Sequence, residues 1–449
     1  MADTPLNLIV LVSDTFRADH IGCFGNERIK TPCLDRLASE GTAFTNVYAD
    51  GLPTIPERRV LFTGNSIIPS REHGGWRPLS PDDVTLPNIL RENGYTTSFF
   101  TDVYHYFKPG MNFHEGFNAW EWIRGQENDP YRSGPRNSVD PRHHMPEHLW
   151  HDGKQTHRMF ESCDERMRQY LMNTIGRENE EDYHCARTLR AAMTWLEQNM
   201  NNPPFMMFVD IFDPHEPWDA PPRFQNMYHD SIPFERYLFG YGMDFRDIRP
   251  EDYDILRALY AAEVTFVDMW IGRFCDRLEE LGLRDNTIIF FTTDHGTHLG
   301  EEGCFTKTAG LLNSCIARLP LIIRHPEPGF RGARIDTLAS STDYMPTLLD
   351  MLGIDNTYDT DGTSLFGLMK GETGTIHERV FTEFGPFAAV HTDDWHYFQH
   401  TQGDDQGKGP ALYDLQTDPD ETRNVADTHE ETVEKMRGYL EEKLGYSLP

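Results

Sequence analysis

The stretch NLIVLVSDT, Asn7–Thr15, is an apolar run that ends abruptly on polar residues. A second stretch, TIIFFTTDH over Thr287–His295, repeats the pattern far along the chain. Short apolar runs rich in β-branched and aromatic residues are typical of buried strands. In open α/β sheets, functional sites lie beyond the carboxyl ends of the strands. The two stretches therefore predict a site that contains Asp14 from the first strand and Asp294 with His295 from the second.

Strand and helix patterns alternate over most of the chain. Such alternation predicts an α/β fold with a largely parallel sheet and helices on both of its faces. The strand candidates are Leu8–Val12, Thr96–Thr101, Phe205–Ile211, Thr287–Thr292 and Leu319–Arg324. The helix candidates are Pro32–Glu40, Leu86–Asn93, Tyr183–Asn199, Asp252–Leu283 and Met345–Leu352.

Two regions depart from this alternation. Residues 124–154 are rich in Pro, His, Arg, Asn and Asp, and they predict a long excursion of the kind that is usually functional or disordered. Near the end, a strand-like run at Phe387–Phe398 and a helical pattern at Glu430–Leu444 indicate a small α+β unit. We therefore expect a catalytic domain over residues 1–374 and a C-terminal subdomain over residues 375–449.

Composition excludes several classes of protein. The chain has 449 residues, with 41 Lys plus Arg against 72 Asp plus Glu, so its formal net charge is −31. This acidity argues against nucleic-acid binding, although a local cationic pocket could still hold a small anion. Seven cysteines without a CxxC pair favour reduced thiols. Because the sequence shows neither a signal-peptide pattern nor a run of about 20 apolar residues, we expect a cytoplasmic protein without membrane association. A homo-oligomer is compatible with the sequence.

A third segment, PTIPERRVLFTG over Pro53–Gly64, places Thr54 and Arg58 one helical turn apart. A hydroxyl beside a metal ion and an arginine is suited to attack an ester of an oxyacid. Asp294 and His295 together offer an oxygen and an imidazole nitrogen to a divalent ion. From the residues alone, alternatives stay open: Asp14 is also compatible with a turn or a helix N-cap, and Thr54 with an ordinary N-cap.

These three segments resemble the sulfatase family of the alkaline phosphatase superfamily, and further matches follow in family order up to residue 425. The resemblance implies an α/β fold of the alkaline-phosphatase type, a three-layer sandwich with a mostly parallel central sheet and a small C-terminal α+β subdomain. The further matching segments are Asp213–Pro217, Arg318–Ile323, Asp343–Thr347, Asp361–Leu365 and Leu412–Asn424.

Three departures from the family pattern bear on the chemistry. Sulfatases have a Cys or Ser that is oxidised to formylglycine, and this chain has Thr54 at that position, whose oxidation would give a ketone. No formylglycine is therefore expected. Superfamily members with an unmodified Thr nucleophile act on phosphorus. Val103 replaces a family Lys, and Asp14-Thr15 replaces an Asp-Asp pair, as in phosphonate monoester hydrolases.

The resemblance also implies roles for individual residues. It implies one divalent ion (Ca²⁺, Mn²⁺, Mg²⁺ or Zn²⁺) and Thr54 as the nucleophile. The implied metal ligands are Asp14, Thr15, Thr54, Asp294 and His295. The remaining implied catalytic residues, which contact the oxyanion or the leaving oxygen, are Arg58, His105, His215 and Lys307.

We therefore expect a metal-dependent hydrolase that cleaves a small anionic ester through Thr54, with a phosphodiester or a phosphonate monoester as the first choice. Two alternatives stay open. One is an aryl or carbohydrate sulfatase that works without formylglycine. The other is a catalytically silent homologue that binds an anion. Transfer of a phosphoryl group from Thr54 to an alcohol, in place of water, is a variant of the first choice.

Overall fold

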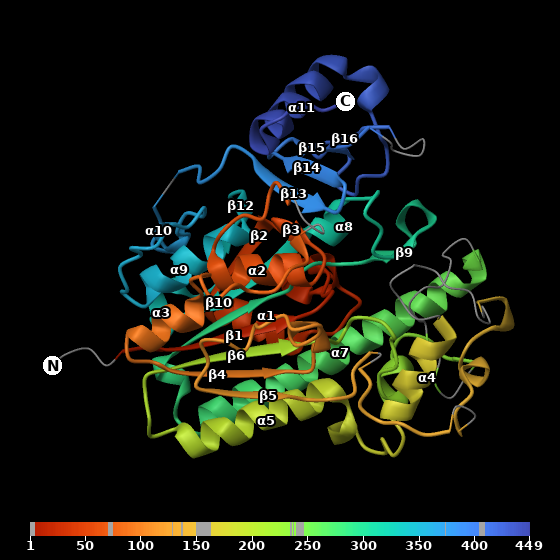
Figure 1. Ribbon diagram of the computed structural model, residues 1–449, viewed down its shortest axis with the longest axis vertical. Coiled ribbons are helices and arrows are strands. Elements are labelled where there is room, and N and C mark those ends of the chain that lie inside the picture. The colour runs from red at the N-terminus through yellow and green to blue at the C-terminus, as the bar shows by residue number, and fades with distance from the viewer. Residues whose placement is uncertain are drawn as a thin grey trace.

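The computed structural model describes residues 5–70, 75–127, 129–135, 138–149, 163–233, 236, 238, 247–372, 374–403 and 409–449 (Figure 1). Within these residues, no helix is long and apolar enough to cross a membrane.

The centre of the protein is a nine-stranded sheet in the order β11-β2-β10-β7-β1-β6-β4-β5, with β12 paired to β2. All its pairings are parallel except those of β10 with β2 and β7, so β10 runs against its neighbours. The strands are β1 (Asn7–Ser13), β2 (Thr42–Tyr48), β4 (Thr96–Thr101), β5 (Ala119–Trp122), β6 (Phe205–Ile211), β7 (Thr287–Thr292), β10 (Arg318–Arg324), β11 (Ala333–Ile335) and β12 (Ala339–Ser340).

Alternate residues of the buried strands pack into two different hydrophobic clusters. In β1, Ile9 and Leu11 join the cluster formed with α1 (Pro32–Glu40), α5 (His184–Asn199) and α7 (Pro250–Glu280). Leu8, Val10 and Val12 join the other cluster, formed with α2 (Ile55–Thr63), α3 (Leu86–Glu92) and α9 (Tyr344–Met351). Because successive side chains of a strand point to opposite faces, each face of the sheet is covered by its own helix layer. Figure 1 shows these three layers, with α5 and α7 on one side of the sheet and α2 on the other.

A five-stranded sheet forms the core of the C-terminal part, in the order β16-β15-β14-β13-β3. Four strands come from the end of the chain, whereas β3 (Gly51–Leu52) comes from just before Thr54 and pairs with β13. Helix α11 (Glu430–Leu444) packs on this sheet through Met436, Leu440 and Leu444. This part lies at one end of the molecule (Figure 1). Its other strands are β13 (Val380–Phe384), β14 (Phe387–His391), β15 (Trp395–His400) and β16 (Ala411–Asp414).

The described part of the chain has six further α-helices and β-strands. They are α4 (Cys163–Asn173), α6 (Pro222–Gln225), α8 (Ser314–Ala317), α10 (Phe366–Met369), β8 (His298–Leu299) and β9 (Phe305–Thr306).

The predicted strands and helices agree with the structure to within about three residues at their ends, except at Phe387–Phe398. That run is not one strand, because it turns at Thr392–Asp394 and forms the hairpin of β14 and β15. In the predicted excursion, the described residues include two 3₁₀ turns, at Pro141–His144 and Glu147–Leu149. Residues 128, 136–137 and 150–154 of the excursion lie outside the described part.

Candidate active site

Two neighbouring parallel strands end at the candidate site. β1 and β7 pair with Val12 opposite Thr292, so the chain leaves both strands at the same edge of the sheet. Asp14 follows the first strand and Asp294 follows the second. The backbone nitrogen of Thr15 donates to Asp294 Oδ1 at 3.0 Å and ties the two strand ends together. The register of the sheet thus brings the two predicted carboxylates into one group.

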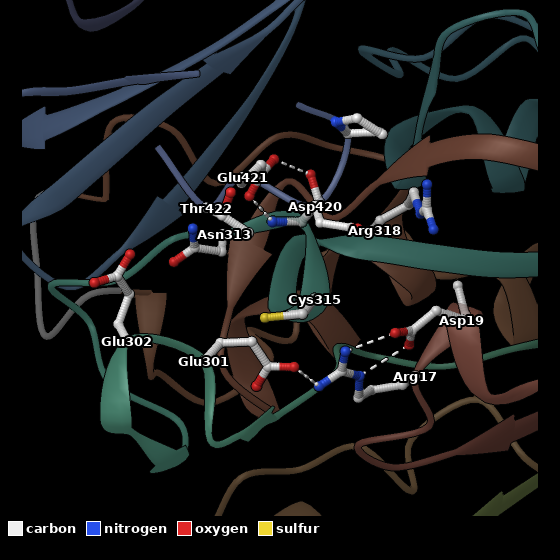
Figure 2. Close-up of a pocket in the computed structure, with 13 residues that line it drawn as sticks. Arg17, Asp19, Glu301, Glu302, Asn313, Cys315, Arg318, Asp420, Glu421 and Thr422 are labelled. Carbon is white, nitrogen blue, oxygen red and sulfur yellow. Dashed lines mark hydrogen bonds and ion pairs between the residues drawn. The ribbon is translucent and has the colours of Figure 1, made fainter. Parts of the chain in front are cut away.

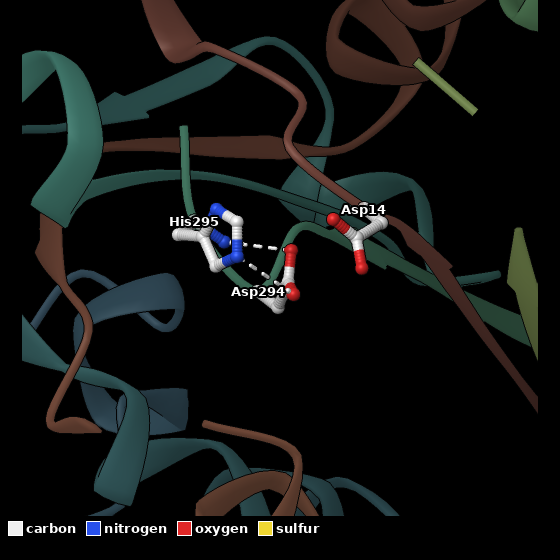
Figure 3. A group of neighbouring side chains, drawn as sticks. All are labelled: Asp14, Asp294 and His295. Atoms are coloured by element: carbon white, nitrogen blue, oxygen red, sulfur yellow. Dashed lines mark hydrogen bonds and ion pairs between the residues drawn. The ribbon is translucent and has the colours of Figure 1, made fainter. Parts of the chain in front are cut away.

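Asp14, Asp294 and His295 form this group, and all three are fully buried (Figure 3). One ligand atom of each residue lies within 4.8 Å of the others. In the described part of the chain, Asp14 Oδ2 and His295 Nε2 find no hydrogen-bond partner. Buried polar atoms without a partner are costly, and a bound cation would satisfy both. The donor set of two carboxylates and one imidazole therefore fits a divalent metal ion.

The imidazole of His295 is prepared for this role. His295 Nδ1 lies 2.8 Å from the carbonyl oxygen of Gly296, and a hydrogen on Nδ1 would be donated there. This assignment leaves the lone pair of Nε2 directed at the group. Burial lowers the pKa of His295 to about 4, so the ring is neutral at pH 7, as a metal ligand must be.

Thr15 supports Asp14. Its hydroxyl donates to Asp14 Oδ1 at 2.6 Å, and its carbonyl accepts a 2.7 Å hydrogen bond from the hydroxyl of Tyr260. Thr15 has φ +62°, which is uncommon for a residue with a side chain. Its hydroxyl hydrogen is used to hold a carboxylate, while its oxygen also lies 3.4 Å from Lys307 Nζ.

Arg58 is completely buried and surrounded by carboxylates. Its Nε and Nη2 each donate to the Asp210 carboxylate at 2.8 Å. Its Nη1 donates to Asp294 Oδ2, and its Nη2 lies 3.0 Å from Asp14 Oδ2 in an ion pair that lacks hydrogen-bond geometry. Tyr106 completes the cage, because its hydroxyl accepts from Arg58 Nε at 3.1 Å and donates to Asp210. The guanidinium therefore positions both carboxylates of the metal group.

Thr54 stands at the N-cap of α2, yet its side chain makes no capping hydrogen bond. Its backbone has φ +37° and ψ −87°, a strained conformation of the kind that persists mainly at functional sites. Its carbonyl accepts from Arg58 Nη1 at 3.3 Å, and the same nitrogen binds Asp294. The ordinary N-cap alternative is thus wrong for the Thr54 hydroxyl. Asp14 is also not an N-cap, since the next helical turn begins after Arg17.

Lys307 and His215 contact each other, and Lys307 also lies near the Thr15 hydroxyl. Lys307 Nζ is 2.8 Å from His215 Nε2 and 3.1 Å from the carboxylate of Glu216. His215 Nδ1 lies 2.9 Å from the carbonyl of Glu216. Burial, and next the Lys307 ammonium, hold the pKa of His215 well below its usual range, so the ring is neutral. Lys307 is therefore the cation of this pair.

His105 approaches the same region from the end of β4. Its ring centroid is 6.2 Å from that of Phe212, which stacks on His215 at 4.2 Å. Val103, at the position of the family Lys, is fully buried in the hydrophobic cluster of α2 and α3. The structure thus brings all the sequence-predicted site residues into one region and supplies no cation at position 103.

Comparison with known proteins identifies the family of the chain. A family model described as Sulfatase matches residues 6–354. The chain belongs to the sulfatase family. A second model, described as N-sulphoglucosamine sulphohydrolase, C-terminal, matches residues 300–446. The protein is thus a hydrolase of ester bonds, and the predicted metal dependence agrees with the general use of a divalent ion in this family.

The sulfatase relatives cover nearly the whole chain. The chain is 26% identical over 503 residues to the N-acetylglucosamine-6-O-sulfatase of Bacteroides thetaiotaomicron, covering 93% of this chain and 82% of the relative. It is 27% identical over 482 residues to an arylsulfatase of Clostridium perfringens, covering 98% and 94%.

Solved structures confirm the predicted alkaline-phosphatase-like fold of this sulfatase-family chain. The phosphonate monoester hydrolase of Agrobacterium radiobacter has a TM-score of 0.75 at 22% identity and covers 98% of this chain and 95% of its own. A protein solved in complex with its substrate D-glucosamine-2-N,6-O-disulfate has the same TM-score and identity, with 98% coverage of both chains.

Sequence reasoning missed four residues of this sulfatase-family site. Asp210 could have been identified from the sequence, because it is a charged residue within the otherwise apolar strand FMMFVDI. An unpaired charge at such a position would be costly. Glu216 was visible beside the matched His215, but its contact with Lys307 depends on the fold. Tyr106 and Glu127, whose carboxylate lies 3.0 Å from His105 Nε2, could not be identified from the sequence, since nothing local distinguishes them from other loop residues.

A separate cavity of about 490 Å³ lies between the catalytic part and the segment Pro419–Thr422 (Figure 2). None of its lining residues belongs to the metal group. Its Arg17 is already paired, at 2.6 Å with Asp19 and at 2.7 Å with Glu301. Arg318 is a second cation of the lining, but five of the seven charged lining residues are acidic, so the cavity does not favour an anion.

Proposed function

We propose that the protein hydrolyses a monoanionic phosphodiester or phosphonate monoester through a covalent intermediate on Thr54. The observation that carries this proposal is Thr54 itself: it occupies the nucleophile position of the family motif, it adjoins the metal group through Arg58, and its hydroxyl is not used for capping. A threonine cannot become formylglycine. A plain threonine sulfate would lack the hemiacetal that expels sulfate, whereas a phospho-threonine is hydrolysed by water at phosphorus.

The residues around Thr54 supply the other requirements. A divalent cation held by Asp14, Asp294 and His295 would act as a Lewis acid and favour ionisation of the Thr54 hydroxyl. In the first step, Thr54 Oγ bonds to phosphorus while the bond from phosphorus to the leaving oxygen breaks. In the second, water attacks the same phosphorus and releases Thr54. Lys307 faces the non-bridging oxygens as a preorganised cation, which stabilises the charge that develops in both steps.

The charges around the site favour a substrate with one negative charge. Four carboxylates, those of Asp14, Asp210, Asp294 and Glu216, face the two cations Arg58 and Lys307. With a bound divalent ion, these charges sum to zero before the Thr54 hydroxyl ionises. A dianionic phosphate monoester would bring excess negative charge into a buried region, which is unfavourable. A diester or a phosphonate monoester carries one negative charge, so its binding avoids this cost.

The comparisons support two substrate classes. The named sulfatase relatives favour a sulfate ester, which is also a monoanion, and the phosphonate monoester hydrolases among the structural neighbours favour phosphorus. We favour the phosphorus ester because of Thr54. A sulfatase that works without formylglycine is the outcome that would replace it.

The test is hydrolysis of four matched 4-nitrophenyl esters (phosphate, methyl phosphate, phenylphosphonate and sulfate) by the purified protein with Mn²⁺, Ca²⁺, Mg²⁺ or Zn²⁺. We expect the methyl phosphate or the phenylphosphonate to be hydrolysed with the highest kcat/KM. Thr54→Ala should reduce that value by about 10³-fold or more, as loss of a nucleophile does. Thr194→Ala, a matched change on α5, should leave it unaltered.

Acid quenching of the wild-type reaction followed by mass spectrometry should find the phosphoryl or phosphonyl group on the peptide that contains Thr54. Dominant sulfate hydrolysis, or full activity of Thr54→Ala, would refute the proposal.

A further inference from the structure

The first part of the predicted excursion folds back onto His105. Glu127 Oε2 lies 3.0 Å from His105 Nε2 in an ion pair that lacks hydrogen-bond geometry, and the Glu127 side chain is only 5% exposed. No role for Glu127 follows from the family motifs in the sequence. A carboxylate held this close to an imidazole can orient the ring and stabilise its protonated form, as in carboxylate–histidine pairs of hydrolases.

The loop that carries Glu127 is fixed on both sides. The buried Asp129 carboxylate accepts from Arg124 at 2.6 and 2.8 Å and from the backbone nitrogen of Gly125 at 3.0 Å. Gln126 Nε2 donates to Asp213 Oδ1 at 2.6 Å, just before His215 in the chain. The loop is therefore attached to the end of β6, which also positions His215.

The backbone of Glu127 is itself constrained. Its φ is +53°, a conformation that side-chain-bearing residues adopt rarely and at a cost of about 1 kcal/mol or more. The surrounding hydrogen bonds impose this conformation and keep the Glu127 carboxylate at His105 in a part of the loop that is shielded from water.

His105 lies in the same region as Arg58 and His215. The next residue, Tyr106, binds Arg58, and the His105 ring faces Phe212, which stacks on His215. Trp76 packs against the His105 ring in a T-shaped contact, with centroids 5.2 Å apart. With Nε2 facing Glu127, Nδ1 is the nitrogen that is left for substrate.

We propose that Glu127 is a positioning residue: it orients His105 so that, when the ring carries both protons, Nδ1–H is available to the leaving oxygen. This inference rests on the proposed function. When Thr54 Oγ bonds to phosphorus, the bond to the leaving oxygen breaks, and its electron pair stays on that oxygen. The oxygen takes the Nδ1 proton, which leaves His105 neutral with its Nε2 still beside the Glu127 carboxylate. The attacking water returns a proton to Nδ1 in the second step.

The inference predicts a dependence on the leaving group. A phenyl or alkyl leaving group needs a proton, whereas 4-nitrophenolate departs readily without one. Glu127→Gln should therefore lower kcat/KM for the phenyl ester by about 10²-fold, a usual contribution of general acid catalysis, and alter that for the 4-nitrophenyl ester far less. In the double variant with His105→Gln, the two losses should be strongly non-additive, because both remove the same proton transfer.

Glu121→Gln is the matched control, since it makes the same chemical change on an exposed side chain of β5 and should alter neither ester. An equal loss on both esters, or no loss on the phenyl ester, would overturn the role of Glu127. The assay uses whichever ester class the wild type hydrolyses, so sulfatase activity would refute the proposed substrate and leave this test intact.

A measurement that needs no substrate tests the pairing of Glu127 with His105 independently of the proposed function. Proton NMR of the whole protein should show an exchange-protected imidazole N–H resonance that is lost both in Glu127→Ala and in His105→Gln. Its presence in an inactive protein would support the pairing and refute the proposed function. A spectrum that is identical in wild type and Glu127→Ala would refute the pairing.

Discussion

Replacement of Arg58 by methionine tests the charge arrangement at the centre of the site. The methionine fills much of the same space but leaves the carboxylates of Asp14, Asp210 and Asp294 without their shared cation. Breaking one buried ion pair costs about 3–5 kcal/mol because the remaining charge is buried without compensation. The bidentate pair of Arg58 with Asp210 is by itself such a buried ion pair, since both of its hydrogen bonds are 2.8 Å and both residues are fully buried. We expect the metal-free Arg58→Met variant to lose about 4 kcal/mol of unfolding free energy.

Relative to the wild type at the same metal concentration, the metal ion should offset only part of this loss. A cation at the metal group can neutralise Asp14 and Asp294, whereas Asp210 is not a member of that group. Ion binding at about 1,000 times Kd stabilises a folded protein by about 4 kcal/mol. Arg58→Met should gain more than this from the same metal concentration, because the competing guanidinium is gone. Adding Asp210→Asn should recover about half of the original loss, since it removes the carboxylate that the metal does not reach.

The assay is equilibrium urea unfolding followed by tryptophan fluorescence, with EDTA and with added Mn²⁺. Arg36→Met is the control, because the Arg36 side chain is 38% exposed and its pair with Asp276 at 2.9 Å is worth less than about 1 kcal/mol. A metal-free Arg58→Met variant within about 1 kcal/mol of the wild type would refute the reasoning. So would a double variant that is less stable than Arg58→Met alone.

Three further predictions concern metal binding and pH. Asp294→Asn should abolish the rise in melting temperature that Mn²⁺ gives the wild type, and an unchanged rise would contradict the assigned ligand set. Gly296→Ala should weaken metal binding by at least about tenfold in calorimetry, because an added Cβ would lie 2.0 Å from the Cys315 carbonyl oxygen; Gly329→Ala, where a Cβ meets nothing within 4 Å, is the control that should bind normally. Burial, and next Arg177, lower the pKa of His184 to about 3, so the folded state keeps this ring neutral. The stability gained from this neutral ring is present above the unfolded pKa of about 6.5 and is lost as the pH falls toward 3. His184→Phe should therefore lose about 2 kcal/mol less than the wild type in urea unfolding between pH 7 and pH 5, and equal losses would show that His184 is not the group responsible.

Local sequence patterns were sufficient to predict the positions of most helices and strands. Thr96–Thr101, Phe205–Ile211 and Thr287–Thr292 coincide with strands because continuous apolar runs between turn residues have few other buried conformations. The antiparallel direction of β10 was not predictable, since a strand's periodicity carries no information about its direction in the sheet. The hairpin within Phe387–Phe398 was missed because its polar turn was read as part of one run.

The sequence by itself determined the chemical groups of the site: a threonine in place of the family Cys or Ser, a valine in place of Lys, and carboxylates after two apolar strands. Only the tertiary structure decided what these groups contact. Arg58 meets Asp210 across 152 residues of sequence and Asp294 across 236, and Glu127 meets His105 from a loop without a recognisable motif. Such contacts are set by the side-by-side register of β1, β6 and β7 and by the loops attached to their ends. Local periodicity predicts that a strand forms, but the neighbour of each side chain depends on which strands pair and in what register.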